Sequence, residues 1–270
     1  MSTTPSTSTT AAGNEVLFEV RDNVAVITLN RPQRHNAFND TMSEELRFHI
    51  READAHRDVR AILLRGEGPS FCSGRDTALL GARHGGETDF EFVRRSQQTR
   101  TLLLDSPRPV IVAMKGHTYG GGLEVALAGD IRIAATTLSC GFPESVHGLV
   151  VDTGGSALAT ALIGPARAKY LLMTGDRIDA HTALSWGLVE FVVEPEELEE
   201  RAWGIASRLA RMSPLAVQMS KQLVDNQWDA HVRSALRSEL MAQTALFTSQ
   251  DRVELKAARA EGRDPHFEGR

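Results

Sequence analysis

The residues best suited to chemistry surround three consecutive glycines, Gly120, Gly121 and Gly122, which Glu124 closely follows. An apolar run at 110–114 precedes them and a helix-like stretch follows, so we predict a strand, a glycine turn and a helix. Because glycine lacks a Cβ, a ligand can approach the peptide groups of this turn closely. The first N–H groups of a helix lack intrahelical partners and attract negative charge. The pattern indicates a pocket for an anion or a developing oxyanion; the alternative is an ordinary turn with a surface glutamate.

Two familiar glycine-rich phosphate sites do not fit this turn. A P-loop needs Lys and Ser or Thr after its last glycine, whereas Leu123 and Glu124 follow here. The dinucleotide fingerprint G-x-G-x-x-G also fails, because Val125 stands in place of its third glycine. The turn therefore serves another kind of ligand.

Composition bounds the class of protein. A chain of 270 residues with 41% hydrophobic content can form one large domain, or a domain with an appendage. A net charge of −5 with scattered Lys and Arg gives no electrostatic footprint for nucleic acid. Cys72 and Cys140 have apolar neighbours and no metal-ligand spacing, which predicts reduced thiols in a cytoplasmic protein. No apolar run reaches the roughly 18 residues of a membrane span, so we expect no membrane partner.

The N-terminal part predicts a tail, a hairpin and a helix. Residues 1–13 are mostly Ser, Thr, Pro, Ala and Gly, which predicts a disordered tail rather than a signal peptide. Residues 16–20 and 24–30 predict the two strands of a hairpin. Either Asp40 or Thr41 can cap a helix that runs to about residue 55.

Beyond this point the chain changes character at Gly154 and Gly155, from strand-turn-helix units to mostly helices. The further strands are expected at 60–65, 131–135, 138–142 and 188–193, and the further helices at 90–104, 157–163, 166–173, 180–186, 195–212, 214–225, 230–247 and 251–260. This order suggests an α/β core with a helical C-terminal appendage. We set the boundaries at 1–13 for the tail, 14–205 for the core and 206–270 for the helical region.

Taken together, the motifs resemble those of the crotonase family, the enoyl-CoA hydratase/isomerase superfamily, over nearly all of residues 15–270. The matching motifs are Arg31-Pro32 with Asn36-Ala37, F-C-S-G-R-D at 71–76, G-G-G-L-E-V-A at 120–126, P-E-S-V-H-G at 143–148 and D-T-G-G at 152–155. Each motif alone is weak, and their order and spacing make the match. The resemblance implies a crotonase-like spiral of repeated ββα units, then a C-terminal helical region that mediates trimerisation.

The resemblance also implies an acyl-CoA thioester substrate, with CoA as part of that substrate and no metal or redox cofactor. The shared chemistry is stabilisation of a thioester enolate by two backbone N–H groups, which match Arg75 and Gly121 by position. Donors fixed before the reaction need no reorganisation as charge develops. Family members often have a small residue where this chain has Arg75, which leaves the shape of its acyl pocket open. The matched substrate-binding positions are Arg34, Gly74, Asp76 and Gly120. For Arg34, near the CoA phosphates by resemblance, a solvated arginine is the alternative.

Three acids decide which reaction follows. Glu124 and Glu144, 20 residues apart, match the pair that holds a water over the double bond in hydratases of this family. We assign Glu124 to activating water and Glu144 to protonating the α-carbon, a division that works if their environments separate their pKa values. Asp152 matches an acid of some family isomerases, and an Asp before the paired glycines also occurs in carnitinyl-CoA dehydratase. The alternative for Asp152 is a cap on the helix that begins near Gly155.

We therefore predict a cytoplasmic enoyl-CoA hydratase, with an enoyl- or dienoyl-CoA isomerase or an acyl-CoA dehydratase using Asp152 as the alternative. Some crotonase homologues bind RNA, but the charge of −5 and the absence of a basic helix argue against that partner. We expect a homotrimer or a dimer of trimers, because the last helices carry many apolar residues. These residues include Leu236, Leu240, Leu246 and Phe247.

Overall fold

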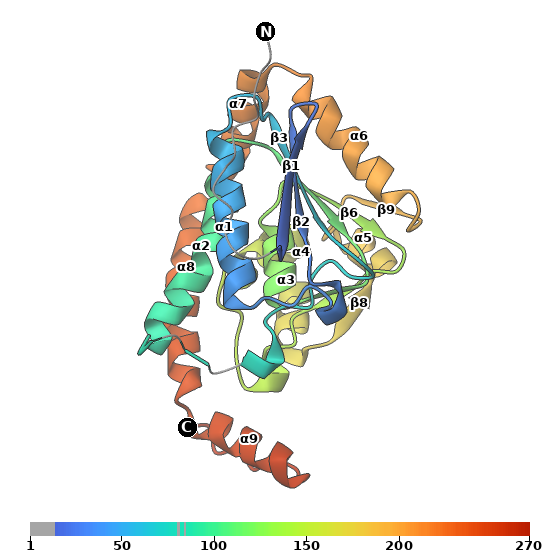
Figure 1. The fold of residues 1–270 in the computed structure, drawn as a ribbon. Coiled ribbons are helices and arrows are strands. Elements are labelled where there is room, and N and C mark those ends of the chain that lie inside the picture. The colour runs from blue at the N-terminus through green and yellow to red at the C-terminus, as the bar shows by residue number, and fades with distance from the viewer. Residues whose placement is uncertain (1–13, 80–81, 84) are drawn as a thin grey trace.

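The α/β architecture is confirmed by a computed structural model, which describes residues 14–79, 82–83 and 85–270 (Figure 1). The predicted tail at 1–13 lies outside the described residues. The strands form two sheets, and helices cover the larger sheet on both faces. In Figure 1, α6 (Leu198–Ala210) lies on one side of that sheet, and α1 (Asp40–Ala55), α2 (Asp89–Asp105) and α8 (Asp229–Phe247) lie on the other.

The larger sheet has the strand order β1-β2-β3-β4-β6-β9. Its strands are β1 (Val16–Arg21), β2 (Val24–Leu29), β3 (Ala61–Gly66), β4 (Val110–Met114), β6 (Ile131–Ala135) and β9 (Phe191–Val193). The hairpin of β1 and β2 is antiparallel, as predicted, and every other pair in this sheet is parallel. Asp22 and Asn23 both have positive φ, which gives the tight turn whose twist suits a two-residue hairpin. The parallel strands are almost continuously buried, because both of their faces are covered.

A second sheet of three short strands supports the glycine turn. It consists of β5 (His117–Tyr119), β7 (Ser139–Gly141) and β8 (Arg177–Asp179), in the order β5-β7-β8. Neither β5 nor β8 was predicted from the sequence, because three residues are too few to show an alternating pattern. The amide of Gly120 donates to the carbonyl of Gly141 at 3.0 Å, which ties the turn to the end of β7.

The start of α1 differs from the prediction by one residue. Asn39 has extended backbone and its side chain accepts a hydrogen bond from the amide of Met42 at 2.8 Å, so Asn39 is the cap. The predicted caps, Asp40 and Thr41, are wrong. Asp40 instead turns its carboxylate toward Arg75, an ion pair that matters for the pocket described below.

The remaining helices follow the expected pattern closely. They are α3 (Gly121–Leu127), α4 (Gly155–Thr174), α5 (Ala180–Trp186), α7 (Pro214–Asp225) and α9 (Gln250–Glu261), with single turns at Pro32–Arg34, Thr77–Leu79 and Ser145–His147. The helices predicted at 157–163 and 166–173 are the two arms of α4, which breaks at Gly164 before Pro165. The predicted boundary between residues 205 and 206 falls inside α6, and the domain division stays a prediction.

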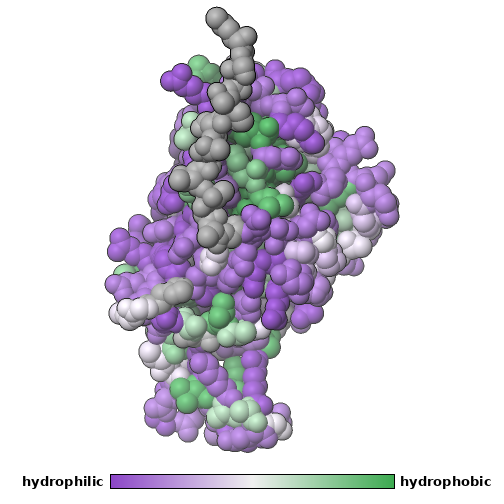
Figure 2. Space-filling model, viewed as in Figure 1, coloured by the Kyte–Doolittle hydropathy of each residue, from purple (hydrophilic) through white to green (hydrophobic). Residues whose placement is uncertain are grey.

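The hydropathy of the surface and the lengths of the helices limit which partners the described part of the chain can contact. Figure 2 shows a largely hydrophilic face on which hydrophobic side chains gather near β1 and around α9. Among the described residues, no helix combines the length and the apolar character that crossing a bilayer requires. Inside, the described residues form two main clusters of buried apolar side chains, one on each face of the larger sheet, and α6 covers the smaller of these two. A third, small cluster of Phe92, Val93 and Leu240 joins α2 to α8.

Candidate active site

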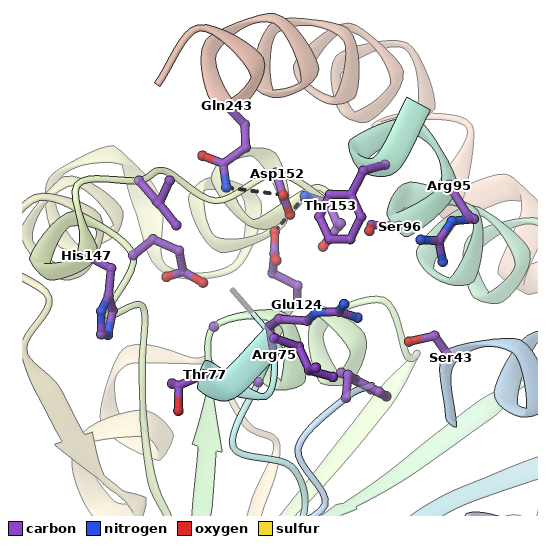
Figure 3. Close-up of a pocket in the computed structure, with 18 of the residues that line it drawn as sticks. Ser43, Arg75, Thr77, Arg95, Ser96, Glu124, His147, Asp152, Thr153 and Gln243 are labelled. Atoms are coloured by element: carbon purple, nitrogen blue, oxygen red, sulfur yellow. Dashed lines mark hydrogen bonds between the residues drawn. The ribbon is translucent and has the colours of Figure 1, made fainter. Parts of the chain in front are cut away.

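A pocket lies where the glycine turn meets α1, α2, the start of α4 and α8 (Figure 3). Seven of the residues predicted for the site line it: Gly74, Arg75, Gly120, Gly121, Glu124, Glu144 and Asp152. These residues come from segments that are far apart in the sequence, so the fold alone brings them together.

Two glycines let the backbone segments of the pocket approach each other. Gly120 has φ 48° and ψ −124°, and a Cβ at this position would overlap Oε1 of Glu144. Gly74 has φ 92°, and a Cβ there would lie 2.7 Å from the carbonyl oxygen of Tyr119 and 3.6 Å from the amide nitrogen of Gly121. Other residues would be strained at both positions and would also collide with their neighbours. Both glycines therefore permit a close contact that the site requires.

The amides of Arg75 and Gly121 are both free of partners within the described part of the chain. Phe38 donates to the carbonyl of Gly74 at 2.7 Å and accepts from Asp76 at 2.9 Å, and this pairing leaves the amide of Arg75 unused. Gly121 is the first residue of α3, where an amide has no intrahelical acceptor. The close approach of Gly74 to the Gly121 nitrogen places the two amides on neighbouring segments of the pocket.

Glu124 is held rigidly at the base of the pocket. Its side chain is buried, and Oε1 accepts hydrogen bonds from the amides of Thr153 at 2.9 Å and Gly155 at 3.0 Å. Figure 3 shows the carboxyl group directed from α3 toward the segment that opens α4. The start of a helix favours negative charge, so this arrangement stabilises an ionised carboxylate.

Glu144, unlike Glu124, has a buried carboxyl oxygen that accepts no hydrogen bond from the described residues. It follows Pro143 beside the glycine turn, and the buried oxygen is Oε2. Burial and the neighbouring charge of Glu124 raise the pKa of Glu144 well above its usual range. Glu144 is therefore suited to hold a proton, while Glu124 is held by donors that favour a negative charge.

Asp152 reaches the pocket and does not cap α4. Its Oδ2 accepts from Nε2 of Gln243 at 3.3 Å, and its carbonyl oxygen accepts from Gln97 at 2.8 Å. The alternative, that Asp152 caps α4, is wrong. Gly154 holds the cap position, and no side-chain hydrogen bond from that position caps the helix. Burial and the charge of Glu124 raise the pKa of Asp152 to about 7.

Glu239, in α8, is a buried carboxyl that the sequence analysis missed. Its Oε2 accepts from the amide of Gly154 at 2.6 Å, and its Oε1 accepts from the amide and hydroxyl of Ser156 at 2.9 and 2.5 Å. Glu124 and Glu239 thus divide the free amides at the start of α4 between them. Burial, followed by the charge of Glu124, raises the pKa of Glu239 to about 8. The available signal was a glutamate within the apolar stripe of a long helix.

Two predicted substrate-binding residues do not line the pocket. Arg34 is exposed at the end of the turn Pro32–Arg34. The carboxylate of Asp76 is turned toward Arg31, 3.4 Å away, and also accepts from the amide of Ala78. Their roles stay predictions, and the structure does not place either side chain with the acids of the pocket.

The cysteines are packing residues rather than nucleophiles. Cys72 and Cys140 are both buried and free, and burial raises the pKa of each thiol to about 12. The Sγ of Cys72 donates to the carbonyl of Asn36 at 3.0 Å. Because the thiolate is the reactive form, neither residue is suited to attack a substrate. Within the described ranges, no three His, Cys, Asp or Glu side chains gather as a metal site.

Comparison with known proteins gives the family. A sequence model of the enoyl-CoA hydratase/isomerase family matches residues 19–270. The chain is 35% identical to a short-chain-enoyl-CoA hydratase of Clostridium acetobutylicum, over 93% of this chain and 96% of that protein. It is 33% identical to a crotonyl-CoA hydratase of Syntrophomonas wolfei, over 95% and 98%. A crystal structure of an enoyl-CoA hydratase/isomerase from Xanthobacter autotrophicus superposes with a TM-score of 0.82 at 31% identity, covering 92% of this chain and 94% of that one.

The fold and the pocket thus define an α/β enzyme of the crotonase type. The chain belongs to the enoyl-CoA hydratase/isomerase family. The resemblance predicted from the motifs is confirmed over nearly the whole chain.

Proposed function

We propose that this protein is an enoyl-CoA hydratase, which adds water across the 2,3 double bond of an enoyl thioester. The observation that carries the proposal is the pair Glu124 and Glu144, which line one pocket with two backbone amides that have no partner in the described part of the chain. The hydratase names of the two relatives support an acyl-CoA substrate. The reaction moves only protons and a water molecule, so it calls for no resident metal or redox group.

In the proposed mechanism, the thioester oxygen accepts hydrogen bonds from the amides of Arg75 and Gly121. Neither amide has an acceptor among the described residues, so both can stabilise the enolate oxygen without reorganisation. Glu124, as a carboxylate, takes a proton from water while the water oxygen bonds to the β-carbon. Glu144 gives its proton to the α-carbon, which completes the 3-hydroxyacyl thioester. Glu124 then releases its proton to solvent, and Glu144 takes up a proton from solvent, so both groups return to their starting states.

Asp152 favours a second candidate within the same family. It lines the same pocket, and a pKa of about 7 allows it to hold or release a proton near neutral pH. An isomerase or a dehydratase using Asp152 with Glu144 is therefore the alternative. The distinction depends on whether water enters the product.

The proposal is tested by incubating the purified protein with a panel of 2-enoyl-, dienoyl- and 3-hydroxyacyl-CoA thioesters. We expect enoyl thioesters to gain one water, and the corresponding 3-hydroxyacyl thioesters to lose it in the reverse direction. Mass spectrometry identifies the products. A shift of the double bond without a change of mass would replace hydration by isomerisation.

We also propose that the protein assembles as a trimer or a pair of trimers. Leu236 and Leu240, two of the apolar residues named for the last helices, do not support an interface, because both are buried within the protomer. The helix α7 supplies a better argument, because Leu215, Met219 and Leu223 are 61%, 53% and 70% exposed at successive turns of one face. Sedimentation should give a multiple of three protomers at micromolar concentration. Leu223→Glu should reduce that mass, and a stable wild-type monomer would contradict the proposal.

A further inference from the structure

Five arginines line the pocket together with its acids. The arginines are Arg47, Arg75, Arg83, Arg95 and Arg100. A buried cation is costly unless an anion or several hydrogen-bond acceptors compensate it. The partners of each arginine therefore show which guanidinium groups are compensated by the protein and which one is available to a ligand.

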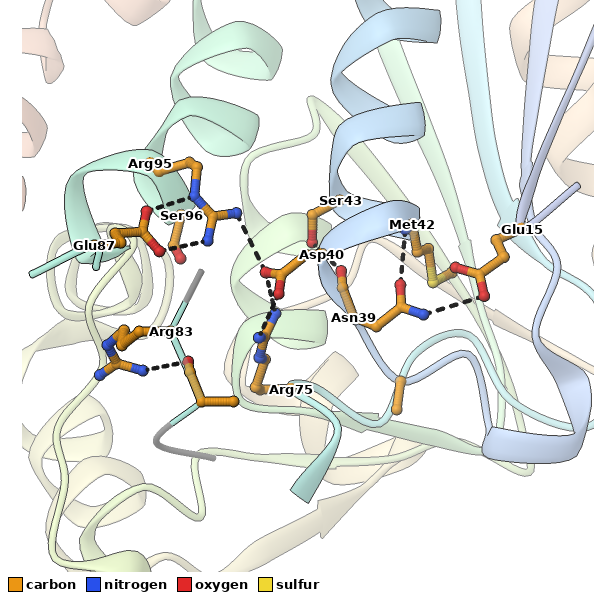
Figure 4. Close-up of polar contacts among 12 residues, drawn as sticks. Glu15, Asn39, Asp40, Met42, Ser43, Arg75, Arg83, Glu87, Arg95 and Ser96 are labelled. Atoms are coloured by element: carbon orange, nitrogen blue, oxygen red, sulfur yellow. Dashed lines mark hydrogen bonds and ion pairs between the residues drawn. The ribbon is translucent and has the colours of Figure 1, made fainter. Parts of the chain in front are cut away.

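Three of these arginines are compensated by carboxylates of the chain itself, and Figure 4 shows the pairs of Arg75 and Arg95. The ion pairs are Arg75–Asp40 at 3.0 Å, Arg95–Glu87 at 2.7 Å, Arg95–Asp40 at 3.2 Å and Arg83–Asp89 at 2.5 Å. Arg75 and Arg95 both approach Asp40, and their charges hold its pKa at about 2 against the effect of burial. This network joins α1, α2 and the segment after Gly74, and it holds the side of the pocket together.

Arg100 acts electrostatically on two acids of the pocket, Glu144 and Asp152. Its Nη2 donates to the carbonyl of Gly121, and its Nη1 donates to the carbonyl of Ser96 at 3.4 Å. The charge of Arg100 also lowers the pKa values of Glu144 and Asp152, against the larger effect of burial. Arg100 therefore compensates part of the negative charge of the proposed catalytic groups.

Arg47 is the arginine without a partner. Its side chain is on the face of α1 that also carries Asp40 and Ser43, and the residue is only 5% exposed. Within the described part of the chain it makes no ion pair or hydrogen bond, and its Nη1 is fully buried and unsatisfied. Burial lowers its pKa most, followed by the charge of Arg95; Arg51 and Arg100 act in the same direction, and Glu44 opposes them.

We propose that the pocket takes an acyl group that carries a carboxylate, and that this carboxylate pairs with Arg47. The inference rests on the proposed function, because the thioester end is taken to lie at Arg75 and Gly121. A guanidinium offers a planar fork that fits a carboxylate, and among the described arginines of the pocket Arg47 is the one with neither an ion pair nor a hydrogen bond. An unsubstituted alkyl chain would leave Arg47 buried and unpaired, which is unfavourable.

The surroundings of Arg47 also suit a polar acyl end. Ser43 from α1 and Ser96 from α2 line the same pocket, and Figure 3 shows Ser96 beside Arg95. Arg75 and Arg95 are already paired with Asp40, so they do not compete for the added carboxylate.

The test compares glutaryl-CoA with pentanoyl-CoA, two saturated thioesters of equal acyl carbon number that cannot be hydrated. Calorimetric titration of the wild-type protein should show about 10- to 100-fold tighter binding of glutaryl-CoA, the usual range for a charged hydrogen bond. Arg47→Met should remove this preference without weakening pentanoyl-CoA, and Arg47→Lys should restore part of it. Arg94→Met is the matched control, because Arg94 is exposed on α2, does not line the pocket and should leave the preference unchanged.

Turnover separates this inference from the proposed function. With glutaconyl-CoA and 2-pentenoyl-CoA, we expect a kcat/KM that is higher for the former by about the same 10- to 100-fold. Equal binding of the saturated pair, or a preference for pentanoyl-CoA, overturns the carboxylate site and leaves hydration intact. A glutaryl-CoA preference that depends on Arg47, in a protein that hydrates neither enoyl thioester, supports the carboxylate site and overturns the hydratase proposal. If neither saturated thioester binds, both are wrong.

Discussion

Replacing Glu144 by glutamine is expected to lower the kcat of hydration by about 10²–10⁴, the usual contribution of a general acid or base. Glutamine keeps the shape of the side chain but cannot deliver a proton to the α-carbon. The structure supports a large effect, because burial and the charge of Glu124 raise the pKa of Glu144 and so favour its protonated form. Glu124→Gln should cause a loss in the same range, since an amide cannot take a proton from water. Single-turnover rates with an enoyl-CoA substrate measure both losses.

Asp152→Asn distinguishes hydration from isomerisation when its rate is compared with those of the two glutamine variants. If hydration is the native reaction, Asp152→Asn should cost less than about tenfold, because Asp152 has no step in the mechanism. The alternative predicts a different order of effects. If Asp152→Asn were as damaging as Glu144→Gln while Glu124→Gln were mild, isomerisation would replace hydration as the best-supported reaction.

The elements that sequence patterns predicted best are those whose stability depends on one long amphipathic or apolar run. The strand β2 and the helix α6 are examples, since β2 is buried along its whole length and α6 buries one apolar face. The strands β5 and β8 were missed because they contain three residues each and exist through pairing with β7. The acids and the glycine turn were found because their spacing resembles a family motif, which periodicity alone would not have shown.

The residues that sequence reasoning missed act through contacts between distant segments. Glu239 caps a helix that begins more than 80 positions earlier in the chain, as its contacts with Gly154 and Ser156 show. Arg47 is one of many arginines in the sequence, and only the packing of α1 against α2 shows that it is buried and that its Nη1 has no acceptor among the described residues. Sequence spacing gives no such information, because it does not say which charges are paired in the folded protein.

Gly121→Pro is expected to lower kcat by at least about 10²–10³, because proline removes the amide that we propose as a donor to the thioester oxygen. Gly121 is the first residue of α3, a position where proline is well tolerated and where no hydrogen bond of the helix is lost. A Cβ at this position would lie 2.8 Å from Nη2 of Arg100, so any substitution also disturbs that side chain. Gly121→Ala is therefore the matched control: it introduces the same contact with Arg100 but retains the amide.

We expect Gly121→Ala to stay within about tenfold of the wild-type kcat, so that the difference between the two variants measures the amide itself. Circular dichroism and thermal unfolding should first show that both variants are folded. Saturated acyl-CoA binding should change much less than kcat, because the enolate carries more charge on its oxygen than the ground-state thioester does. A folded Gly121→Pro variant as active as Gly121→Ala would show that the Gly121 amide stabilises no charge in the reaction, and the mechanism would then need another donor beside Arg75.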